Sequence, residues 1–475
     1  MMHAFVLAAA ALLPQEGQRL DVLFIGDRGH HRPAERLHDV YGPLLRAGFA
    51  VDWEEDLEFV TAERLADYDA VCMYANQPQH RVVPPGFMGA LKGFVQGGGG
   101  FVALHCTSGC FMESQDWLEF VGARFRSHES EVFQQEVVRP EHAIMAGWEN
   151  FRAWDETYVQ DHHAEGREVL TVRGDEPWSW VKDYGQGRIF YTASGHDERV
   201  WRQPAFLDLL IRSLDWAAGE DAAAARKAWH APVFETEAHG WVPNYEGHQP
   251  PPPYQKPSTP EQARRALVVP AGFEAVLFAA EPMVVNPIAM DWDARGRLWV
   301  IESPDYPNGV APERKGGDRI SILTDEDGDG RADKKQVFYE GLNLPTSLLV
   351  VPGAVLVTQA PDLLALLDED GDDRCDSVRT VLSGFGTWDT HAGPSNLTLG
   401  PDNAIWGSVG YANFTGADGK AWGSGLWRLL PDAREPEFVA QFTNNTWGLG
   451  MRPDGEIFGS TANGAPSFFV GAPKA

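Results

Sequence analysis

The sequence predicts two domains of different class, an α/β domain with a doubly wound sheet followed by an all-β propeller. Over residues 18–219, short apolar runs alternate with helix-like stretches, a pattern typical of parallel sheets covered by helices. A proline-rich segment over residues 220–264 then separates this part from the rest. Over residues 265–475, an "Asp, Gly, apolar–aromatic–apolar" signature recurs about every 50 residues, a period that suits four-stranded propeller blades.

The elements of the first domain follow from these runs. Each predicted strand is a short apolar segment that ends in a loop of polar or small residues. The predicted strands cover residues 20–25, 70–74, 100–104 and 188–192, and the predicted helices cover residues 34–47, 85–95 and 206–218. Because the two kinds of element alternate along the chain, we expect one open sheet with helices on both faces.

The composition excludes several classes of protein. With 68 acidic and 39 basic residues among 475, the net charge of -29 repels phosphate backbones, so nucleic acid is excluded as a partner. Four cysteines are too few for a disulfide scaffold, and no C-x-x-C-H haem motif occurs. Residues 1–17 hold a short apolar run that predicts a signal peptide and export to the periplasm or cell surface; the alternative is an apolar tail. No other run is long and apolar enough to predict a transmembrane segment.

The propeller of residues 265–475 is predicted to be incomplete. The signature is clearest at residues 293–300, 401–407 and 453–459, with a weaker copy at 353–357. This length allows about four blades, whereas propellers usually need more to close a ring. The sequence therefore predicts a partial propeller, or a fragment of a longer protein.

Four motifs give the first domain a family resemblance. They are GDRGHHRP at residues 26–33, LHCTSGCF at 104–111, WDETY at 154–158 and GHDER at 195–199. Together they resemble the ThuA (trehalose utilisation) family, which implies a three-layer, flavodoxin-like α/β fold of the class I glutamine-amidotransferase kind. The resemblance also implies a carbohydrate as the small-molecule substrate.

The second half resembles the membrane-bound dehydrogenase propellers of Planctomycetes and Verrucomicrobia, relatives of the glucose/sorbosone dehydrogenases. The motifs that carry this resemblance lie at residues 286–291, 388–397, 444–450 and 460–464. It implies quinoprotein-type oxidation of a sugar hydroxyl or aldehyde, with a c-type cytochrome domain as a partner in longer relatives.

The loop after the predicted strand at 100–104 is where amidotransferase-like domains place a nucleophile. His105 takes the elbow position and Cys106 follows it. Downstream, the His-x-Glu spacing of His196 and Glu198 resembles the base and orienter of a triad, so an activated Cys106 thiolate is one hypothesis. The other is that Cys106 is a small half-buried residue, because ThuA-like domains look as if they put histidine at the elbow.

A polar pocket at the carboxyl ends of the strands is the preferred hypothesis, because open α/β sheets bind ligands there. Its imidazoles and carboxylates could transfer protons to and from a sugar, or bind a divalent metal such as zinc or manganese. Structural histidines without such a role are the alternative for each one alone. The candidate residues are His30, His31, His105, His128, Asp155, Glu156 and His196.

Two acidic loops in the second domain have the pattern of calcium-binding loops, in which carboxylates at alternate positions converge on the cation. The alternative is a pair of solvated acidic hairpins. The candidate ligands are Asp325, Asp327, Asp329 and Asp333 in one loop, and Asp368, Asp370, Asp372 and Asp376 in the other.

His391 is the candidate base of the propeller, because quinoprotein sugar dehydrogenases abstract a hydroxyl proton with a central histidine that it resembles in context. Pyrroloquinoline quinone would be the cofactor, with Arg314, Lys315 and Arg319 near its carboxylates. The sequence thus leaves two functional hypotheses open. One is an exported enzyme that processes or oxidises carbohydrates, and the other is a non-catalytic, calcium-stabilised module that binds glycans or proteins.

Overall fold

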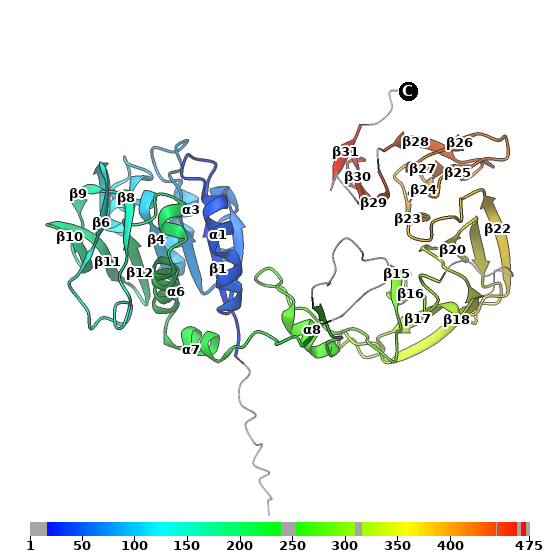
Figure 1. Cartoon of the computed structure of the whole chain (residues 1–475), viewed down its shortest axis with the longest axis horizontal. Helices are drawn as coiled ribbons and strands as arrows, with labels where there is room; N and C mark the ends of the chain where they lie inside the picture. The colour runs from blue at the N-terminus through cyan, green and yellow to red at the C-terminus, as the bar shows by residue number, and fades with distance from the viewer. Residues whose placement is uncertain (1–16, 239–252, 309–315, 443, 463–466, 472–475) are drawn as a thin grey trace, which may run out of the picture. The chain divides into compact units, whose positions relative to one another are not determined.

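The computed structural model describes residues 17–238, 253–308, 316–442, 444–462 and 467–471, so the predicted signal peptide lies almost wholly outside the described residues. The chain divides into two compact units, Met1–Ala275 and Val276–Ala475, which Figure 1 shows as an α/β part and an all-β part. This confirms the predicted pair of fold classes. Among the described residues, every helix is too short or too polar to cross a membrane.

A single eight-stranded sheet forms the centre of the first unit, in the order β2-β1-β3-β4-β12-β11-β10-β7. Neighbours from β2 to β12 run parallel, and the pairs from β12 to β7 run antiparallel. The strands are β1 (Leu20–Ile25), β2 (Phe49–Glu54), β3 (Ala70–Met73), β4 (Gly100–Leu104), β7 (Glu136–Val137), β10 (Glu168–Arg173), β11 (Glu176–Tyr184) and β12 (Gly187–Thr192).

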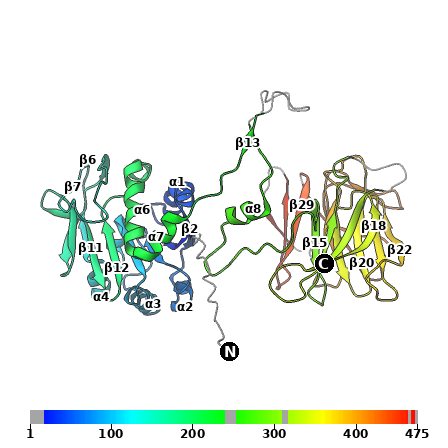
Figure 2. The ribbon, with the colours of Figure 1, turned by 90° about the horizontal axis from the view of Figure 1, so that it is seen from below.

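Helices cover both faces of this sheet, as the alternating sequence pattern predicts. Val22 and Phe24 of β1 pack with one set of helices, and the intervening Leu23 and Ile25 pack with the other, because side chains alternate along a strand. Figure 2 shows α1 and α6 on one side, and α2, α3 and α4 on the other. The helices are α1 (Pro33–Arg46), α2 (Ala62–Leu65), α3 (Pro85–Gln96), α4 (Gln115–Val121), α5 (Glu198–Trp201) and α6 (Pro204–Ala218), with 3₁₀ turns η1 (Leu57–Phe59) and η2 (His105–Gly109).

The strand order creates a topological switch point at one edge of the sheet. From β1 the chain moves outward to β2 and then returns to the opposite side of β1 as β3. The loops that follow β1 and β3 therefore diverge, and open α/β sheets bind ligands at such a switch point, beyond the carboxyl ends of the strands.

Two small antiparallel ladders, which the sequence does not predict, extend the first unit near this edge. In one, β5 (Ala123–Ser127) pairs with β9 (Val159–His163), and in the other β6 (Ser130–Gln134) pairs with β8 (Arg152–Glu156). Strand β8 ends at Glu156, and this ending fixes the position of that side chain.

The predicted linker of residues 220–264 is structured where it begins and where it ends. Helix α7 (Glu220–Ala228) packs on the first unit, where the Arg226 guanidinium donates hydrogen bonds of 2.5 and 2.6 Å to Asp215. Further along, β13 (Thr236–Glu237) pairs with β14 (Tyr254–Gln255), and α8 (Pro260–Ala266) follows a Thr259 capping box. The first unit thus extends to Ala275. The alanine run of α7 favours a helix, and a paired arginine anchors it.

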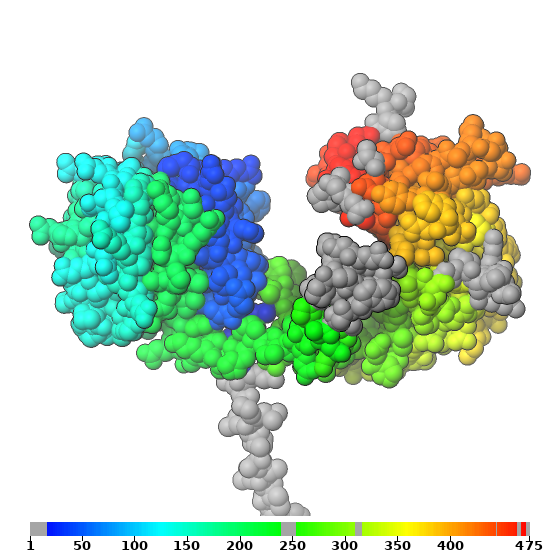
Figure 3. Space-filling view, in the orientation of Figure 1, coloured from blue at the N-terminus to red at the C-terminus, as the bar shows by residue number. Residues whose placement is uncertain are grey.

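The second unit is a row of antiparallel sheets, three four-stranded and one three-stranded among the described residues. The first strands of successive sheets contact one another, as expected for propeller blades. Figure 3 shows the surface of this unit, whose colours pass from green through yellow and orange to red in the order of the chain. The blades are β15 (Pro287–Trp292), β16 (Leu298–Glu302), β17 (Asp318–Thr324) and β18 (Lys334–Leu342); β19 (Ser347–Val351), β20 (Ala354–Gln359), β21 (Asp362–Leu367) and β22 (Ser377–Ser383); β23 (Pro394–Leu399), β24 (Ile405–Val409), β27 (Gly425–Leu429) and β28 (Glu437–Gln441); and β29 (Thr446–Met451), β30 (Ile457–Thr461) and β31 (Phe468–Val470). A short pair, β25 (Phe414–Thr415) and β26 (Ala421–Trp422), extends the third blade's loop.

The repeated signature has a physical reason. In the first blade, Asp293 begins the β15–β16 turn, and its carboxylate accepts a hydrogen bond of 3.0 Å from the indole of Trp299. In the third blade, Asp402 accepts one of 2.9 Å from the indole of Trp406 in the same way. The aspartate satisfies the turn and the buried indole together, so the two residues recur as a pair.

Candidate functional site

Four of the predicted residues converge at the carboxyl edge of the sheet, and we call them the histidine–glutamate cluster. His31 follows β1, His105 follows β4, Glu156 ends β8 and His196 follows β12. One ring nitrogen from each histidine and one oxygen of Glu156 all lie within 4.8 Å of one another. The cluster forms because parallel strands end at the same edge, and the β6–β8 ladder brings Glu156 over it.

His105 occupies the elbow after β4 with a left-handed backbone, at φ 42°, and its side chain is fully buried. Such a conformation costs a non-glycine residue about 1–3 kcal/mol and is concentrated at functional sites. The Nδ1 atom lies 2.7 Å from the Ala193 carbonyl, which can only accept, so Nδ1 carries the proton. The other ring nitrogen, Nε2, faces Glu156, 3.3 Å from Oε2.

His31 is held by a chain of hydrogen bonds between the loops that follow β1 and β3. Its Nδ1 lies 2.5 Å from Oδ1 of Asn76, in the loop after β3. The backbone N–H of Asn76 donates to Asp27, which also accepts from Gly29. Burial, together with the neighbouring His105 and His30, lowers the pKa of His31 to about 3, so its ring is neutral at neutral pH.

Glu156 and His196 form the charged part of the cluster. Nδ1 of His196 lies 3.1 Å from Oε2 of Glu156. Burial acts to raise the pKa of Glu156, but His105 and His196 outweigh burial and hold that pKa well below its usual value. Burial acts to lower the pKa of His196, but the carboxylate outweighs it and the pKa is raised. Glu156 is therefore ionised at neutral pH.

Three ring nitrogens of the cluster are buried without any hydrogen bond from the described residues. They are Nε2 of His31, Nε2 of His105 and Nδ1 of His196. Buried polar atoms in native proteins are nearly always satisfied, and unsatisfied ones need an explanation such as catalysis or an ion. These nitrogens are therefore available to a bound ligand or ion.

Asp155 is not part of the cluster, but it binds the backbone of the residues around it. It is 3% exposed, and its carboxylate accepts hydrogen bonds from the backbone N–H groups of Gly195, His196 and Glu156 at 3.0, 3.1 and 2.9 Å. Burial raises the pKa of Asp155. The side chain thus fixes the loop of His196 and the end of β8 together.

The supporting residues Asp27, Asn76 and Tyr158 escape prediction from the sequence. Asp27 and Asn76 fix His31, and the Tyr158 ring packs 4.1 Å from the His105 ring. The available signal was the short polar stretch that follows each predicted strand, which contains both Asp27 and Asn76. Nothing in the sequence places Tyr158 over His105.

Two exposed histidines line the rim of the cluster. The His30 ring lies 3.9 Å from the His31 ring, and Nδ1 of His128 lies 3.4 Å from Oε1 of Glu156. The Trp154 indole lies beside His196 at 5.7 Å, with the Arg199 guanidinium 3.4 Å above it. The rim therefore offers imidazole and aromatic surface to a ligand.

Two of the predicted catalytic residues lie apart from the cluster chemistry. Cys106 is fully buried in the apolar core, and burial raises the pKa of its thiol well above the usual value, which opposes a thiolate nucleophile. Glu198 points to α1 and lies 3.0 Å from the Arg36 guanidinium, so it does not orient His196. Glu156 takes that place, because α5 begins directly after His196 and turns Glu198 away.

The two acidic loops of the second unit have the same geometry. Asp325, Asp327 and Asp333 place carboxylate oxygens within 4.8 Å of one another, as do the matching three residues of the second loop, Asp368, Asp370 and Asp376. Asp329 and Asp372, also predicted as ligands, are not in these groups. The loops join the third and fourth strands of successive blades. Calcium binding there stays a prediction.

His391 lies on the surface of the second unit, 62% exposed, with Nδ1 3.4 Å from Asp389. Arg319, expected near a quinone, instead pairs with the buried Glu302 at 2.9 Å. Arg314 and Lys315 lie outside the described residues. The pyrroloquinoline quinone site stays a prediction, because none of the three basic residues expected at it is found near His391 in the described part of the chain.

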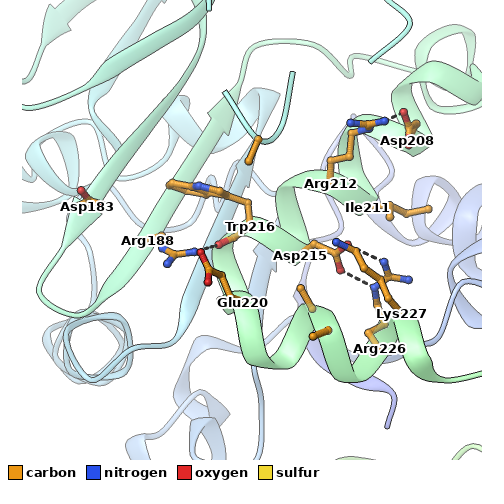
Figure 4. Close-up of a pocket in the computed structure, with 14 residues that line it drawn as sticks. Asp183, Arg188, Asp208, Ile211, Arg212, Asp215, Trp216, Glu220, Arg226 and Lys227 are labelled. Carbon is orange, nitrogen blue, oxygen red and sulfur yellow. Dashed lines mark hydrogen bonds and ion pairs between the residues drawn. The ribbon is translucent and has the colours of Figure 1, made fainter. Parts of the chain in front are cut away.

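A cavity of about 800 Å³ lies elsewhere in the first unit, between α6, α7 and the start of β12 (Figure 4). Its three arginines are engaged, Arg226 with Asp215, Arg212 with Asp208, and Arg188 with the Trp216 carbonyl. It lies toward the amino end of β12, away from the edge where the cluster sits. The buried ring nitrogens that make no hydrogen bond within the described residues lie in the cluster and not in this cavity, so the cluster remains the candidate site.

Comparison with known families agrees with this architecture. Residues 21–217 match the family model described as trehalose utilisation, ThuA. This stretch is a ThuA-like domain. Residues 259–473 match a model described only as a domain of unknown function, DUF7133. No curated protein matches the chain.

The solved structures that align with part of this chain include two ThuA-like proteins and a β-galactosidase. A ThuA-like protein from Bacteroides uniformis is 17% identical with a TM-score of 0.36, and covers 44% of this chain and 95% of its own. A ThuA-like protein from Parabacteroides merdae is 20% identical with a TM-score of 0.37, over 42% and 90%. The cold-adapted β-galactosidase from Rahnella sp. R3 is 23% identical with a TM-score of 0.32, over 42% of this chain and 31% of its own.

Proposed function

We propose that the ThuA-like domain binds a sugar, or an oxidised sugar derivative, at the histidine–glutamate cluster and transfers protons to and from it. One observation carries this proposal: three buried imidazole nitrogens without a hydrogen-bond partner among the described residues converge on one ionised carboxylate. The cluster lies beyond the carboxyl ends of the strands, next to the β1/β3 switch point, where open α/β sheets bind ligands. The trehalose-utilisation description of the matching family supports a carbohydrate as the ligand class.

The exposed histidines at the rim and the buried cluster beneath them have different roles in this proposal. His30 and His128 at the rim are exposed and meet the hydroxyl groups of the ligand. Glu156 and the buried imidazoles beneath them polarise one ligand oxygen, because charge–dipole interactions strengthen where water is excluded. General acid–base steps of this kind contribute about 10²–10⁴-fold to a rate.

Calorimetric titration of the full chain with a panel of sugars, sugar lactones and keto sugars tests the proposal. Glu156→Gln keeps the shape of the side chain but removes its charge, so we expect at least a tenfold loss of affinity for any ligand that binds. His162→Gln, on β9 and paired with Glu119, is the matched control and should bind as the wild type does. Equal affinity in Glu156→Gln and wild type would contradict the assignment.

The second unit carries no reaction in this proposal. Oxidation of sugars by the propeller, with His391 as the base, stays a prediction, as do calcium binding and export. Turnover with an artificial electron acceptor would support the first of these, and no specific contact in the described residues favours it.

A further inference from the structure

The side chains of the histidine–glutamate cluster are of the kinds that bind transition metals, and one donor atom from each lies close to the others. We infer that His31, His105, Glu156 and His196 bind one first-row divalent metal ion, zinc in the first instance, in the floor of the ThuA-like domain. The inference goes beyond sugar binding, because it concerns the ion alone and holds or fails without any carbohydrate.

The two distances from Glu156 to its neighbouring ligand atoms are close to the edges of a tetrahedron. Zinc binds imidazole nitrogen and carboxylate oxygen at about 2.0–2.2 Å, which places neighbouring ligand atoms about 3.3–3.6 Å apart. Oε2 of Glu156 lies 3.3 Å from Nε2 of His105 and 3.1 Å from Nδ1 of His196. These separations leave room for an ion at the centre after a shift of a few tenths of an ångström.

The protonation pattern delivers lone pairs to that centre. A metal-bound histidine commonly donates its other ring N–H to an oxygen, which fixes the tautomer and the ring orientation. His105 uses Nδ1 for the Ala193 carbonyl and His31 uses Nδ1 for Oδ1 of Asn76, so both present Nε2 to the cluster. Those two nitrogens and Nδ1 of His196 are buried and make no hydrogen bond in the described part of the chain.

The ligand set selects among cations. Three nitrogens and one carboxylate suit zinc, cobalt, nickel or manganese, whereas calcium and magnesium prefer oxygen ligands alone. Among the residues that the structure describes, the oxygen-only groups are the two acidic loops of the second unit. An excess of calcium therefore occupies any cation site in those loops and leaves the cluster free, which makes the two kinds of site separable.

With an ion in place, the four side chains of the cluster act as its ligands, and the proton transfers of the proposed function pass to the exposed His30 and His128 at the rim. His128 contacts Oε1 of Glu156, whereas His105 and His196 contact Oε2. This division predicts that His128→Ala retains the ion.

Metal content measures the inference directly. The full chain is stripped with a chelator, dialysed against zinc chloride in a large excess of calcium chloride, desalted and assayed by plasma mass spectrometry. We expect about one zinc ion per chain in the wild type and in His162→Ala, and at least a hundredfold weaker binding in Glu156→Gln and His196→Gln. Asn76→Ala keeps all four ligands but releases the His31 ring, and should weaken binding about 10–100-fold.

Cobalt gives an independent readout of the geometry. Tetrahedral cobalt with nitrogen ligands absorbs visible light strongly, whereas octahedral oxygen sites absorb weakly. We expect this absorption in the wild type and not in Glu156→Gln, with circular dichroism confirming that both are folded. Zinc content equal in wild type and both ligand variants, or no cobalt absorption in the wild type, would overturn the inference. If the chain binds zinc but no sugar in the panel binds to it, the proposed function fails and the metal site stands.

Discussion

His105 shows how a single residue makes the site. Its left-handed backbone turns the ring back over the end of β4, the Ala193 carbonyl fixes one nitrogen, and Tyr158 packs against the ring. These three constraints hold the second nitrogen against Glu156 before any ligand arrives. Preorganisation of this kind removes the cost of arranging the groups at the moment of binding.

Asp155 gives a prediction at the same scale. In Asp155→Asn, an amide NH₂ replaces one of the two oxygens that accept hydrogen bonds from Gly195, His196 and Glu156. Each buried N–H that loses its acceptor costs about 1–3 kcal/mol, so we expect the first unit to lose at least that much stability. Urea unfolding followed by tryptophan fluorescence measures it, with the exposed Asp175→Asn as the control. An unchanged midpoint for Asp155→Asn would show that the loop of His196 is stable without these hydrogen bonds.

The sequence predicts part of this site, for a definite reason. An apolar run that ends in polar residues marks the carboxyl end of a strand, so His31, His105 and His196 can be placed at one edge without a structure. The positions of Cys106 and Glu198 cannot be predicted in this way. Cys106 comes directly after His105 but lies in the apolar core, and Glu198 begins α5 and contacts Arg36 on α1. The contact of Glu156 with the histidines depends on the β6–β8 ladder, which leaves no clear periodic signal.

At the scale of elements, the first blade is held by one buried carboxylate. Glu302 ends β16 and is fully buried. It accepts hydrogen bonds from Arg319 and Ser321 on β17 and from the backbone of Val285, and Lys335 on β18 lies 2.7 Å away. Burial acts to raise the pKa of Glu302, but these hydrogen bonds outweigh it and lower the pKa to about 2.

The Glu302 carboxylate should make the stability of the second unit fall at low pH. The pKa of Glu302 is about 2 in the folded chain against an ordinary value of 4.5, so its contribution to stability is complete above about pH 4.5 and is lost as the pH falls towards 2. Glu302→Gln leaves Arg319 and Lys335 without their charge partner, and we expect a loss of about 3–5 kcal/mol at pH 7.

Urea unfolding at several pH values measures the effect. The difference between wild type and Glu302→Gln should shrink steadily as the pH falls from 5 to 2, because the wild-type carboxyl then becomes neutral as well. Asp432→Asn, an exposed aspartate between β27 and β28 of the third blade, is the control and should differ little at any pH. A difference that stays constant with pH would assign the loss to packing and not to charge.

The propeller strands are easier to predict from sequence than their interactions. The aspartate–glycine turns repeat because each carboxylate satisfies a turn and an indole, so strand positions can be read from Asp293 and Asp402. The Glu302 network leaves no such mark, because its partners come from β17, β18 and the segment before β15, at irregular spacing. The alanine-rich helix α7 is likewise mistaken for linker, since its anchoring pair Arg226–Asp215 is visible only in three dimensions.

At the scale of the whole molecule, the hydrophobic clusters among the described residues each belong to one unit. Two draw only on residues before 223, and three draw only on residues after 277. Domains with separate cores are separate cooperative units, so a single free energy of unfolding does not describe this chain.

Calorimetry of the full chain should therefore resolve two unfolding transitions, and the two variants above assign them. Asp155→Asn should lower the midpoint of one transition and Glu302→Gln that of the other. Each kcal/mol lost shifts the midpoint by about 2–4 °C in a unit of this size. Zinc should raise only the transition that Asp155→Asn lowers, because an ion that binds one folded unit stabilises that unit. One transition that both variants shift together would mean that the two units unfold as one.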